Sequence, residues 1–355
     1  MQEYKCPCCG GAIEFDSGSQ KMKCPYCSTE FDMETLALYD AELHSDAADS
    51  MEWETAAGCA WQEGEADGLR TYVCNSCGGE IVGDENTAAT ACPFCGNPVV
   101  MTGQFSGALK PDLVIPFQLD KKAAKAALMR HLSGKRLLPK IFKDQNHIDE
   151  IKGVYVPFWL FDADADAHVR YKATRVRSWS DSRYHYTETS HYAVIRGGSI
   201  GFERVPVDAS SKMPDDHMDS IEPYDYKELR AFSTAYLPGF LADKYDVTVE
   251  QSCERADGRC AASLEGALRR TTTQYDACIT KDKDIRLRRG KVHYALLPVW
   301  MLHTKWNGKD FLFAMNGQTG KLVGDLPTDM GKFWAIFAAI AAPVSAIAAA
   351  ILMLV

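Results

Sequence analysis

The residues with the clearest chemistry are eight cysteines arranged as four Cys-x-x-Cys pairs. They form two sets with the same internal spacing, and each residue of the second set lies 68 positions after its counterpart in the first. Flanking residues repeat at the same interval, among them Pro25 and Pro93. The chain therefore contains an internal duplication, whose two sets are Cys6, Cys9, Cys24 and Cys27, and Cys74, Cys77, Cys92 and Cys95.

Four thiolates in this spacing can hold one zinc ion in a tetrahedral site, because each Cys-x-x-Cys turn brings two sulfurs to the same ion. We expect two structural zinc ribbons, over residues 1–32 and 71–103, each binding one Zn²⁺. A unit of this size buries too little apolar surface to fold alone, so metal binding, worth roughly 10–16 kcal/mol, would supply its stability. A redox role for the cysteine pairs would require a βαβ setting, which the flanking sequence lacks.

The other cysteines are expected to be buried or idle thiols. The N-terminus Met-Gln-Glu-Tyr-Lys-Cys has no apolar core of a signal peptide, so we expect a reducing compartment rather than disulfide formation. These five cysteines are Cys8, Cys59, Cys253, Cys260 and Cys278.

Residues 333–355 form an uncharged apolar run at the C-terminus. A helix of 23 residues covers ~34 Å, which exceeds a hydrocarbon core of ~30 Å. Trp334 stands at its start, where interfacial aromatic residues occur. We expect a single-pass tail anchor in the cell membrane, with the bulk of the chain in the cytoplasm.

Residues 33–70 are predicted to form an acidic linker. Between Cys24 and Leu69 there are twelve Asp and Glu and no Lys or Arg. A phosphate-binding surface needs cations, so this composition and the net charge of -9 argue against nucleic acid as the partner without excluding it. The linker, which carries Trp53 and Trp61, is expected to be a protein-docking segment or a solvated tether.

Residues 104–330 are expected to form a β-rich α+β domain with packed helices. Asp120 is a candidate N-cap for a helix over Lys121–Leu132. The surrounding stretch Lys110–Lys143 is basic and is either a solvated helix face or a contact with anionic lipid. From Val154 the pattern has a period of two, with Ala163, Ala165, Ala167, Val169, Tyr171 and Ala173 on one face of a long strand.

The sequence further predicts a three-stranded meander over Leu296–Val323, with a type I′ turn at Asn307-Gly308. The similarity between Val156–Leu160 and Leu297–Met301 suggests two related β units. Helices are expected over Lys227–Leu241 and over parts of Val249–Arg270. The aspartates at 162, 164 and 166 do not form a calcium loop, because Ala167 and Ala173 stand where that loop needs Gly and Glu.

Motifs for catalysis are absent from the sequence. It contains no phosphate loop, no His-Glu-x-x-His pair and no Gly-x-Ser-x-Gly elbow. A zinc ion held by four cysteines also lacks the open position that a catalytic zinc keeps. We therefore expect that the protein is not an enzyme.

With the paired ribbons, Val156–Asp162, Pro298–Trp300 and Asn316–Lys321 in view, the chain resembles a bacterial family of transcription-factor-IIB-type zinc-ribbon membrane proteins. The resemblance implies association with flotillin-like (SPFH) proteins and phage-shock protein A in membrane-stress systems. Some members are labelled as primosomal helicases because of their ribbons, but the chain lacks a phosphate loop. We expect a membrane-anchored scaffold or adaptor; the alternative is a nucleic-acid-binding protein tethered to the membrane.

Overall fold

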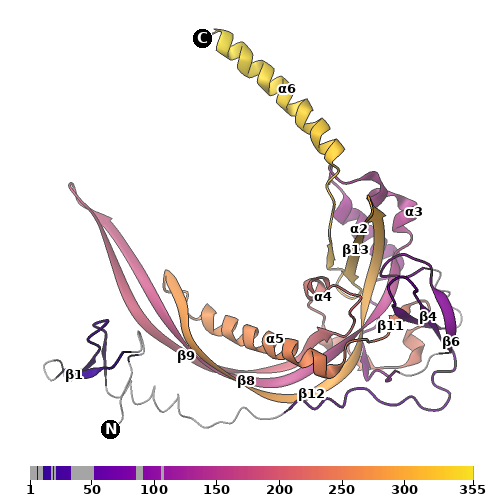
Figure 1. Cartoon of the computed structure of the whole chain (residues 1–355), viewed down its shortest axis with the longest axis horizontal. Helices are drawn as coiled ribbons and strands as arrows, with labels where there is room; N and C mark the ends of the chain where they lie inside the picture. Colours follow the sequence, from indigo (N-terminus) through magenta and orange to yellow (C-terminus); the bar gives the residue numbers. More distant parts are fainter. Residues whose placement is uncertain are drawn as a thin grey trace. The chain divides into compact units, whose positions relative to one another are not determined.

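The structure is a computed structural model that describes residues 6, 11–16, 19, 21–32, 52–84, 91–104 and 108–354. The chain divides into two compact units. Three long strands, β8 (Lys152–Ser180), β9 (His185–Asp208) and β12 (Ala277–Trp306), each contribute to both (Figure 1). Unit 1 comprises Met1–Glu54, Phe161–Val205 and Cys253–Lys291, and unit 2 comprises Thr55–Leu160, Pro206–Ser252 and Val292–Val355.

Unit 2 is built on a mixed sheet in which β12 and β8 are neighbours. Its strand order is β10 (Arg230–Ala231), β7 (Leu113–Val114), β12, β8, β11 (Leu241–Asp243), β5 (Glu80–Asp84), β4 (Leu69–Val73) and β6 (Val100–Gln104). The chain continues from β12 into β13 (Lys309–Asn316) and β14 (Leu322–Gly324), all antiparallel. Asn307 and Gly308 have φ of 49° and 73°, so the predicted meander and its turn are confirmed.

Helices cover this sheet. The predicted helix α2 (Lys121–Leu132) is confirmed, and the Asp120 side chain accepts a hydrogen bond from the Ala123 N–H (2.7 Å). Leu128 lies in the core that α2 shares with η1 (Lys140–Lys143), α3 (Gln145–Ile148) and the strands β12 and β13. A short helix, α4 (Asp215–Ile221), places Met218 and Ile221 in the second core cluster of this unit.

The helix predicted over Lys227–Leu241 is wrong. This segment instead contains η2 (Tyr226–Glu228), β10, η3 (Thr234–Tyr236) and the start of β11. Pro238 has no N–H to donate within a helix, and Gly239 has a φ of 83°, so a continuous helix cannot pass through them. The short elements let Phe232 and Leu237 bury their side chains.

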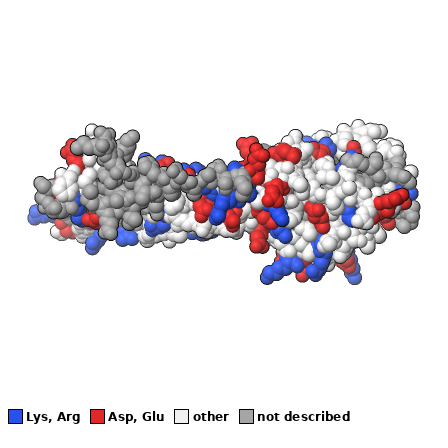
Figure 2. All heavy atoms as spheres, turned by 90° about the horizontal axis from the view of Figure 1, so that it is seen from below, with Lys and Arg blue, Asp and Glu red and all other residues white. Residues whose placement is uncertain are grey.

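Charged side chains of both signs are interspersed over the described part of the face drawn in Figure 2. Within the basic stretch Lys110–Lys143, Lys110 pairs with Glu65 and Lys125 pairs with Asp149, both at 2.7 Å. Ion pairs of this kind are typical of a solvated surface. The structure does not test the other interpretation of this stretch, a contact with anionic lipid.

Unit 1 contains the distal parts of the long strands and most of the helix α5 (Val249–Arg270), from Cys253 onward, which lies along them (Figure 1). The predicted alternation is confirmed, since Ala165, Val169 and Ala173 are fully buried while His168 and Lys172 between them are exposed. The predicted helix over Val249–Arg270 is also confirmed. A separate three-stranded sheet holds β1 (Glu14–Asp16), β2 (Lys21–Lys23) and β3 (Glu30–Phe31).

In the described part of the acidic linker Trp53 is packed, whereas Glu52, Glu54 and Glu63 are exposed. Trp53 is buried against Phe161, with ring centroids 4.8 Å apart. Its indole N–H donates to Asp257 on α5 (3.1 Å), and Arg289 on β12 binds the same carboxylate at 2.9 Å. Trp53 is therefore an internal anchor, because its own chain offers an apolar surface and an acceptor. Residues 33–51 of the linker lie outside the described residues.

A buried tryptophan connects β8 to the segment after β11. The indole N–H of Trp159 donates to the carbonyl of Val247 (3.0 Å). The N–H of Ala209 donates to the carbonyl of Pro157 (2.9 Å). The carbonyl of Ala209 in turn accepts from the N–H groups of Asp246 and Val247.

The same set of bonds recurs around β12. The indole N–H of Trp300 donates to the carbonyl of Leu119 (3.0 Å). The N–H of Gly317 donates to the carbonyl of Pro298 (2.8 Å), and the carbonyl of Gly317 accepts from Gln118 and Leu119. The two related β units expected from the sequence are thus confirmed in unit 2 by matching hydrogen bonds.

The two repeats exchange strands. One repeat runs through β7, α2 and β8, and the other runs through β11, α5 and β12. β11 pairs in parallel with β8, Leu241 facing Val154, and β7 pairs in parallel with β12, Leu113 facing Ala295. Each short strand therefore pairs with the long strand of the other repeat. Because neither repeat completes its own part of the sheet, we expect the two to fold together.

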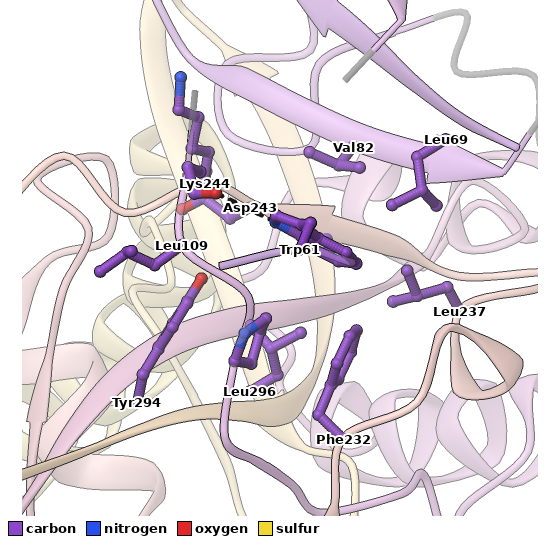
Figure 3. Close-up of a pocket in the computed structure, with 13 residues that line it drawn as sticks. Trp61, Leu69, Val82, Leu109, Phe232, Leu237, Asp243, Lys244, Tyr294 and Leu296 are labelled. Carbon is purple, nitrogen blue, oxygen red and sulfur yellow. Dashed lines mark hydrogen bonds between the residues drawn. The ribbon is translucent and has the colours of Figure 1, made fainter. Parts of the chain in front are cut away.

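The repeats differ at one buried position. Ile115 follows β7 at the place that Asp243 takes at the end of β11, and both are buried. Asp243 lines a cavity of about 30 Å³, enough for a water molecule, together with Trp61 and Tyr294 (Figure 3). Burial raises the pKa of Asp243 to about 8, although hydrogen bonds with Ser210 and Lys244 oppose the rise. The carboxyl group therefore favours its protonated form near neutral pH.

This position gives the unfolding free energy a pH dependence. Because the pKa of Asp243 is raised from 3.8 to about 8 on folding, the folded state holds an extra proton between these values and stability falls as the pH rises through that window. Asp243→Asn is expected to stabilise unit 2 by on the order of 2–5 kcal/mol at pH 8 and by little at pH 4. Urea unfolding of the detergent-purified chain at both pH values measures this.

Asp246 supplies a control, because its pKa is shifted in the opposite direction to that of Asp243. Burial would raise the pKa of its carboxyl, but hydrogen bonds with Ser211 and the charge of Lys212 lower it. Asp246→Asn should therefore destabilise the protein at neutral pH. Equal gains for Asp243→Asn at pH 4 and pH 8 would contradict the assignment of a protonated Asp243.

The C-terminal helix α6 spans Met330–Leu354. Its segment Met330–Ala349 is long and apolar enough to cross a membrane, and none of it is buried within the structure. A core helix of a soluble protein would be mostly buried, so the exposure of Ile340, Val344 and Ile347 separates α6 from that class. The chain therefore carries one candidate transmembrane helix among the described residues.

Candidate metal centres

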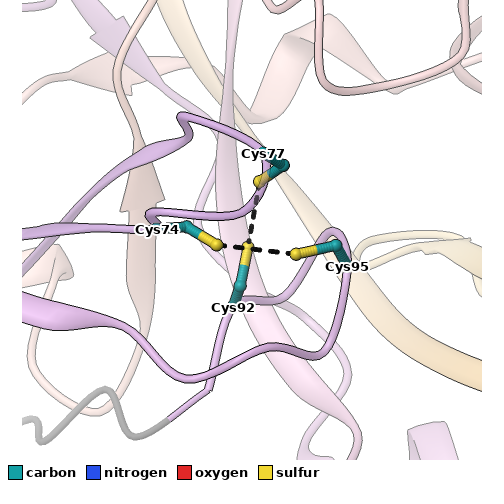
Figure 4. A group of neighbouring side chains, drawn as sticks. All are labelled: Cys74, Cys77, Cys92 and Cys95. Carbon is teal, nitrogen blue, oxygen red and sulfur yellow. Dashed lines mark hydrogen bonds between the residues drawn. The ribbon is translucent and has the colours of Figure 1, made fainter.

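The second cysteine set is brought together in unit 2. The sulfur atoms of Cys74, Cys77, Cys92 and Cys95 all lie within 4.8 Å of one another (Figure 4). Sγ of Cys74 lies 3.5 Å from Sγ of Cys95, and Sγ of Cys77 lies 3.6 Å from Sγ of Cys92. Thiolates that share one tetrahedral zinc ion at ~2.3 Å lie ~3.8 Å apart. The four sulfurs are thus positioned to hold a metal ion.

The backbone around each pair forms the same tight turn. The N–H of Cys74 donates to the carbonyl of Gly79, and the N–H of Cys92 donates to the carbonyl of Asn97. Gly78 and Gly96, with φ of 72° each, donate back to the carbonyl groups of Cys74 and Cys92. A positive φ at these positions redirects the chain that follows, and glycine adopts it without steric cost.

The first set repeats this geometry as far as the structure describes it. The sulfur atoms of Cys6, Cys24 and Cys27 lie within 4.8 Å of one another, with Cys6 and Cys27 at 3.5 Å. Ser28, the counterpart of Gly96, has a φ of 55° and donates to the carbonyl of Cys24. Cys9, the fourth predicted ligand, lies outside the described residues, as does Cys8.

The last cysteine of each set has a lowered pKa. Burial alone would raise the pKa of Cys95, but hydrogen bonds from the backbone and side chain of Asn97 lower it to about 7. In the first set, burial is likewise outweighed by hydrogen bonds with Thr29, and the pKa of Cys27 falls to about 6. Thr29 and Asn97 are counterparts in the duplicated sequence. Such thiolates are ready ligands near neutral pH.

A lysine compensates negative charge at the second set. Nζ of Lys152 donates to the carbonyl of Ala91 (2.5 Å) beside Cys92. Burial lowers the pKa of Lys152, and attraction to Cys92 opposes that change. A metal bound by four thiolates carries net negative charge, so a nearby cation stabilises it. Neither Lys152 nor Asn97 was predicted from the sequence. Asn97 could have been found, because a polar residue stands two positions after the last cysteine of each set.

The two ribbons differ in what surrounds them. Cys74, Cys92 and Phe94 belong to the buried core of unit 2, and β5 pairs with β11 of the central sheet. The first ribbon has its own small sheet, and Tyr26, the counterpart of Phe94, is 76% exposed where Phe94 is 8% exposed. Both rings pack over the equivalent glycine of their ribbon, Gly11 or Gly79. The duplicated ribbons therefore keep one internal structure and different surroundings.

The similarity of the chain to a known protein extends over nearly its whole length. It is 36% identical over 338 residues to "Uncharacterized protein YdjG" of Bacillus subtilis (strain 168), across 95% of this chain and 94% of the relative. The chain belongs to the YdjG family. No family model and no solved structure matches it. Because the two ribbons end near residue 103, a match of this extent covers most of the chain beyond the ribbons and is not limited to the cysteine-rich region.

Proposed function

We propose that the protein is an adaptor held at the membrane by α6, with two structural zinc ions, in which the second ribbon stabilises the body and the first ribbon binds a partner protein. The second ribbon supplies strands to the central sheet of unit 2, whereas the first has a small sheet of its own. No reaction is proposed, because a metal ion with four cysteine ligands keeps no open position for a substrate.

The observation that carries the proposal is the contrast between Tyr26 and Phe94. The surface of the second ribbon around Phe94 is buried against its own chain, so this face can dock on protein. In the first ribbon Tyr26 is 76% exposed and Phe15 is 52% exposed. Exposed aromatic side chains on one small unit are typical of protein interfaces. The first ribbon therefore offers a partner the kind of face that the second has already used.

The anchor follows from α6. Its apolar stretch is unburied and of sufficient length, and thiolate ligands persist in a reducing compartment. We propose a single span with the bulk of the chain in the cytoplasm. Among partners, the resemblance to the zinc-ribbon membrane proteins favours flotillin-like (SPFH) or phage-shock-protein-A-like proteins.

Tyr26→Ser tests the docking face. The change leaves the cysteine ligands in place, so zinc content should stay at two ions per chain, while affinity for the partner should fall by about tenfold or more, as at an aromatic hot spot. Purified flotillin-like and phage-shock-protein-A-like proteins of the host, immobilised and titrated with the full chain in detergent, provide the measurement.

Lys21→Ala is the matched control. Lys21 lies on the same ribbon but pairs with Asp32 at an exposed site, so its loss should change affinity little. Unchanged binding by Tyr26→Ser would refute the docking face. Recovery of nucleic acid instead of protein, weakened by salt, would favour the alternative of a tethered nucleic-acid-binding protein.

A further inference from the structure

The β8–β9 hairpin of unit 1 ends in an exposed aromatic tip. Its turn is built by Asp181, whose Oδ1 accepts from the N–H groups of Arg183 and Tyr184 and whose Oδ2 accepts from the hydroxyl of Tyr186. Trp179 stacks on Tyr186 with ring centroids 5.6 Å apart and an interplanar angle of 14°. The guanidinium of Arg177 lies over the Trp179 ring at 5.6 Å.

The two faces of this tip differ in chemistry. Ser178 lies opposite Thr187, and Ser180 opposite His185, with side-chain contacts of 3.4 and 2.6 Å. Adjacent strand residues point to opposite faces, so the stacked pair and Arg177 are on the other side. The tip thus has a hydroxyl-bearing face and an aromatic, cationic face.

The aromatic face continues the buried face of β8. Nearer the body of unit 1, this face carries the buried residues Val169, Tyr171 and Ala173. The buried part of this face ends around Tyr275, which contacts Tyr192 and the guanidinium of Arg175. Beyond it Trp179 is 45% exposed, and the hairpin continues past the end of α5 in Figure 1. An apolar face is therefore left uncovered where the helix stops.

We propose that this tip contacts the headgroup region of an anionic bilayer. Trp and Tyr side chains favour the membrane interface because an apolar ring and a polar group share one side chain. The segment Arg175–Tyr192 carries three arginines against two carboxylates, and one of those, Asp181, is occupied by the turn. A projecting tip of this kind suits a fluid surface, which needs no matching pocket. Such a contact rests on the proposed location of the chain at a membrane but is independent of docking by the first ribbon.

Fluorescence quenching tests it on the full chain. The protein is reconstituted in phosphatidylcholine vesicles, with or without phosphatidylglycerol, that carry a nitroxide lipid labelled near the headgroup. The contribution of Trp179 is the difference between wild type and Trp179→Phe. In vesicles with phosphatidylglycerol this contribution should be quenched about twofold or more, as expected for an interfacial indole. The contribution of buried Trp53, obtained with Trp53→Phe, should be unchanged.

The outcomes separate the tip from the anchor. Alkaline extraction reports whether the chain is integral to the membrane, whatever the tip does. With the chain integral, absence of quenching at Trp179 would overturn the proposal. Equal quenching without phosphatidylglycerol would overturn its anionic requirement, and shielding of Trp179 that follows protein density rather than lipid would assign the tip to a second copy of the chain. Loss of the phosphatidylglycerol effect in Arg177→Gln would support the proposal.

Discussion

Replacing Cys92 with serine is expected to unfold unit 2, whereas replacing Cys24 is expected to leave it folded. Cys92 is buried in the core cluster that contains Ile81 and Val156, and the ribbon around it supplies strands to the central sheet. A structural zinc site contributes roughly 10–16 kcal/mol, which equals or exceeds the stability of about 5–15 kcal/mol of a typical protein. Loss of this site should therefore unfold the whole of unit 2.

Cys24 lies in a ribbon with a sheet of its own. Its loss should remove one metal ion and unfold the first ribbon alone. Circular dichroism and urea unfolding of the two variants in detergent measure the contrast. Cys59→Ser is the matched control, because Cys59 is exposed and outside both sets, and should change stability by no more than about 0.5 kcal/mol. Similar unfolding curves for the Cys24 and Cys92 variants would contradict the different roles of the ribbons.

The second large effect is expected at the matched tryptophans. Trp159 and Trp300 are both buried, and each donates one hydrogen bond to the segment before a helix of the other repeat. Each also meets an aromatic ring edge-on, Tyr245 at 5.2 Å and Phe117 at 5.1 Å respectively. Truncation of either to alanine should cost about 3–5 kcal/mol, and the two costs should be similar.

Because the repeats exchange strands, both variants should also lower the same single unfolding transition. Thermal or urea unfolding followed by far-ultraviolet circular dichroism measures this. Thr304→Val is a control outside the duplicated contacts, since it removes one buried hydrogen bond with His147 and should cost only about 1 kcal/mol. Two separate transitions, one affected by each tryptophan, would show that the repeats fold independently and would refute the interlocked arrangement.

Features that depend on local spacing could be predicted from the sequence. The turn at Asn307-Gly308, the α2 cap at Asp120 and the alternation along β8 all follow from neighbouring residues, and the structure confirms them. The grouping of Cys74, Cys77, Cys92 and Cys95 follows from the same kind of pattern. Residues close together in the sequence decide each of these features, so contacts with distant parts of the chain are not needed to predict them.

Features that depend on distant contacts could not be predicted. The similarity around Trp159 and Trp300 indicated two β units, but the exchange of β7 and β11 depends on which strands meet in the folded sheet. The acidic composition around Trp53 suggested a protein-docking segment or a solvated tether. Its partners Phe161 and Asp257 are more than a hundred residues away, so local composition could not reveal them. Likewise Tyr26 and Phe94 look equivalent in sequence, and only the surroundings make one exposed and the other buried.

Metal bound by both cysteine sets underlies the roles proposed for the two ribbons. The decisive measurement is the metal content per chain, by elemental mass spectrometry, of the wild type and of the Cys24→Ser and Cys92→Ser variants purified in detergent. We expect two zinc ions in the wild type and one in the Cys24→Ser variant, with unit 2 still folded. Wild-type protein that is folded without metal would contradict these roles, and iron in place of zinc would contradict the proposed ion.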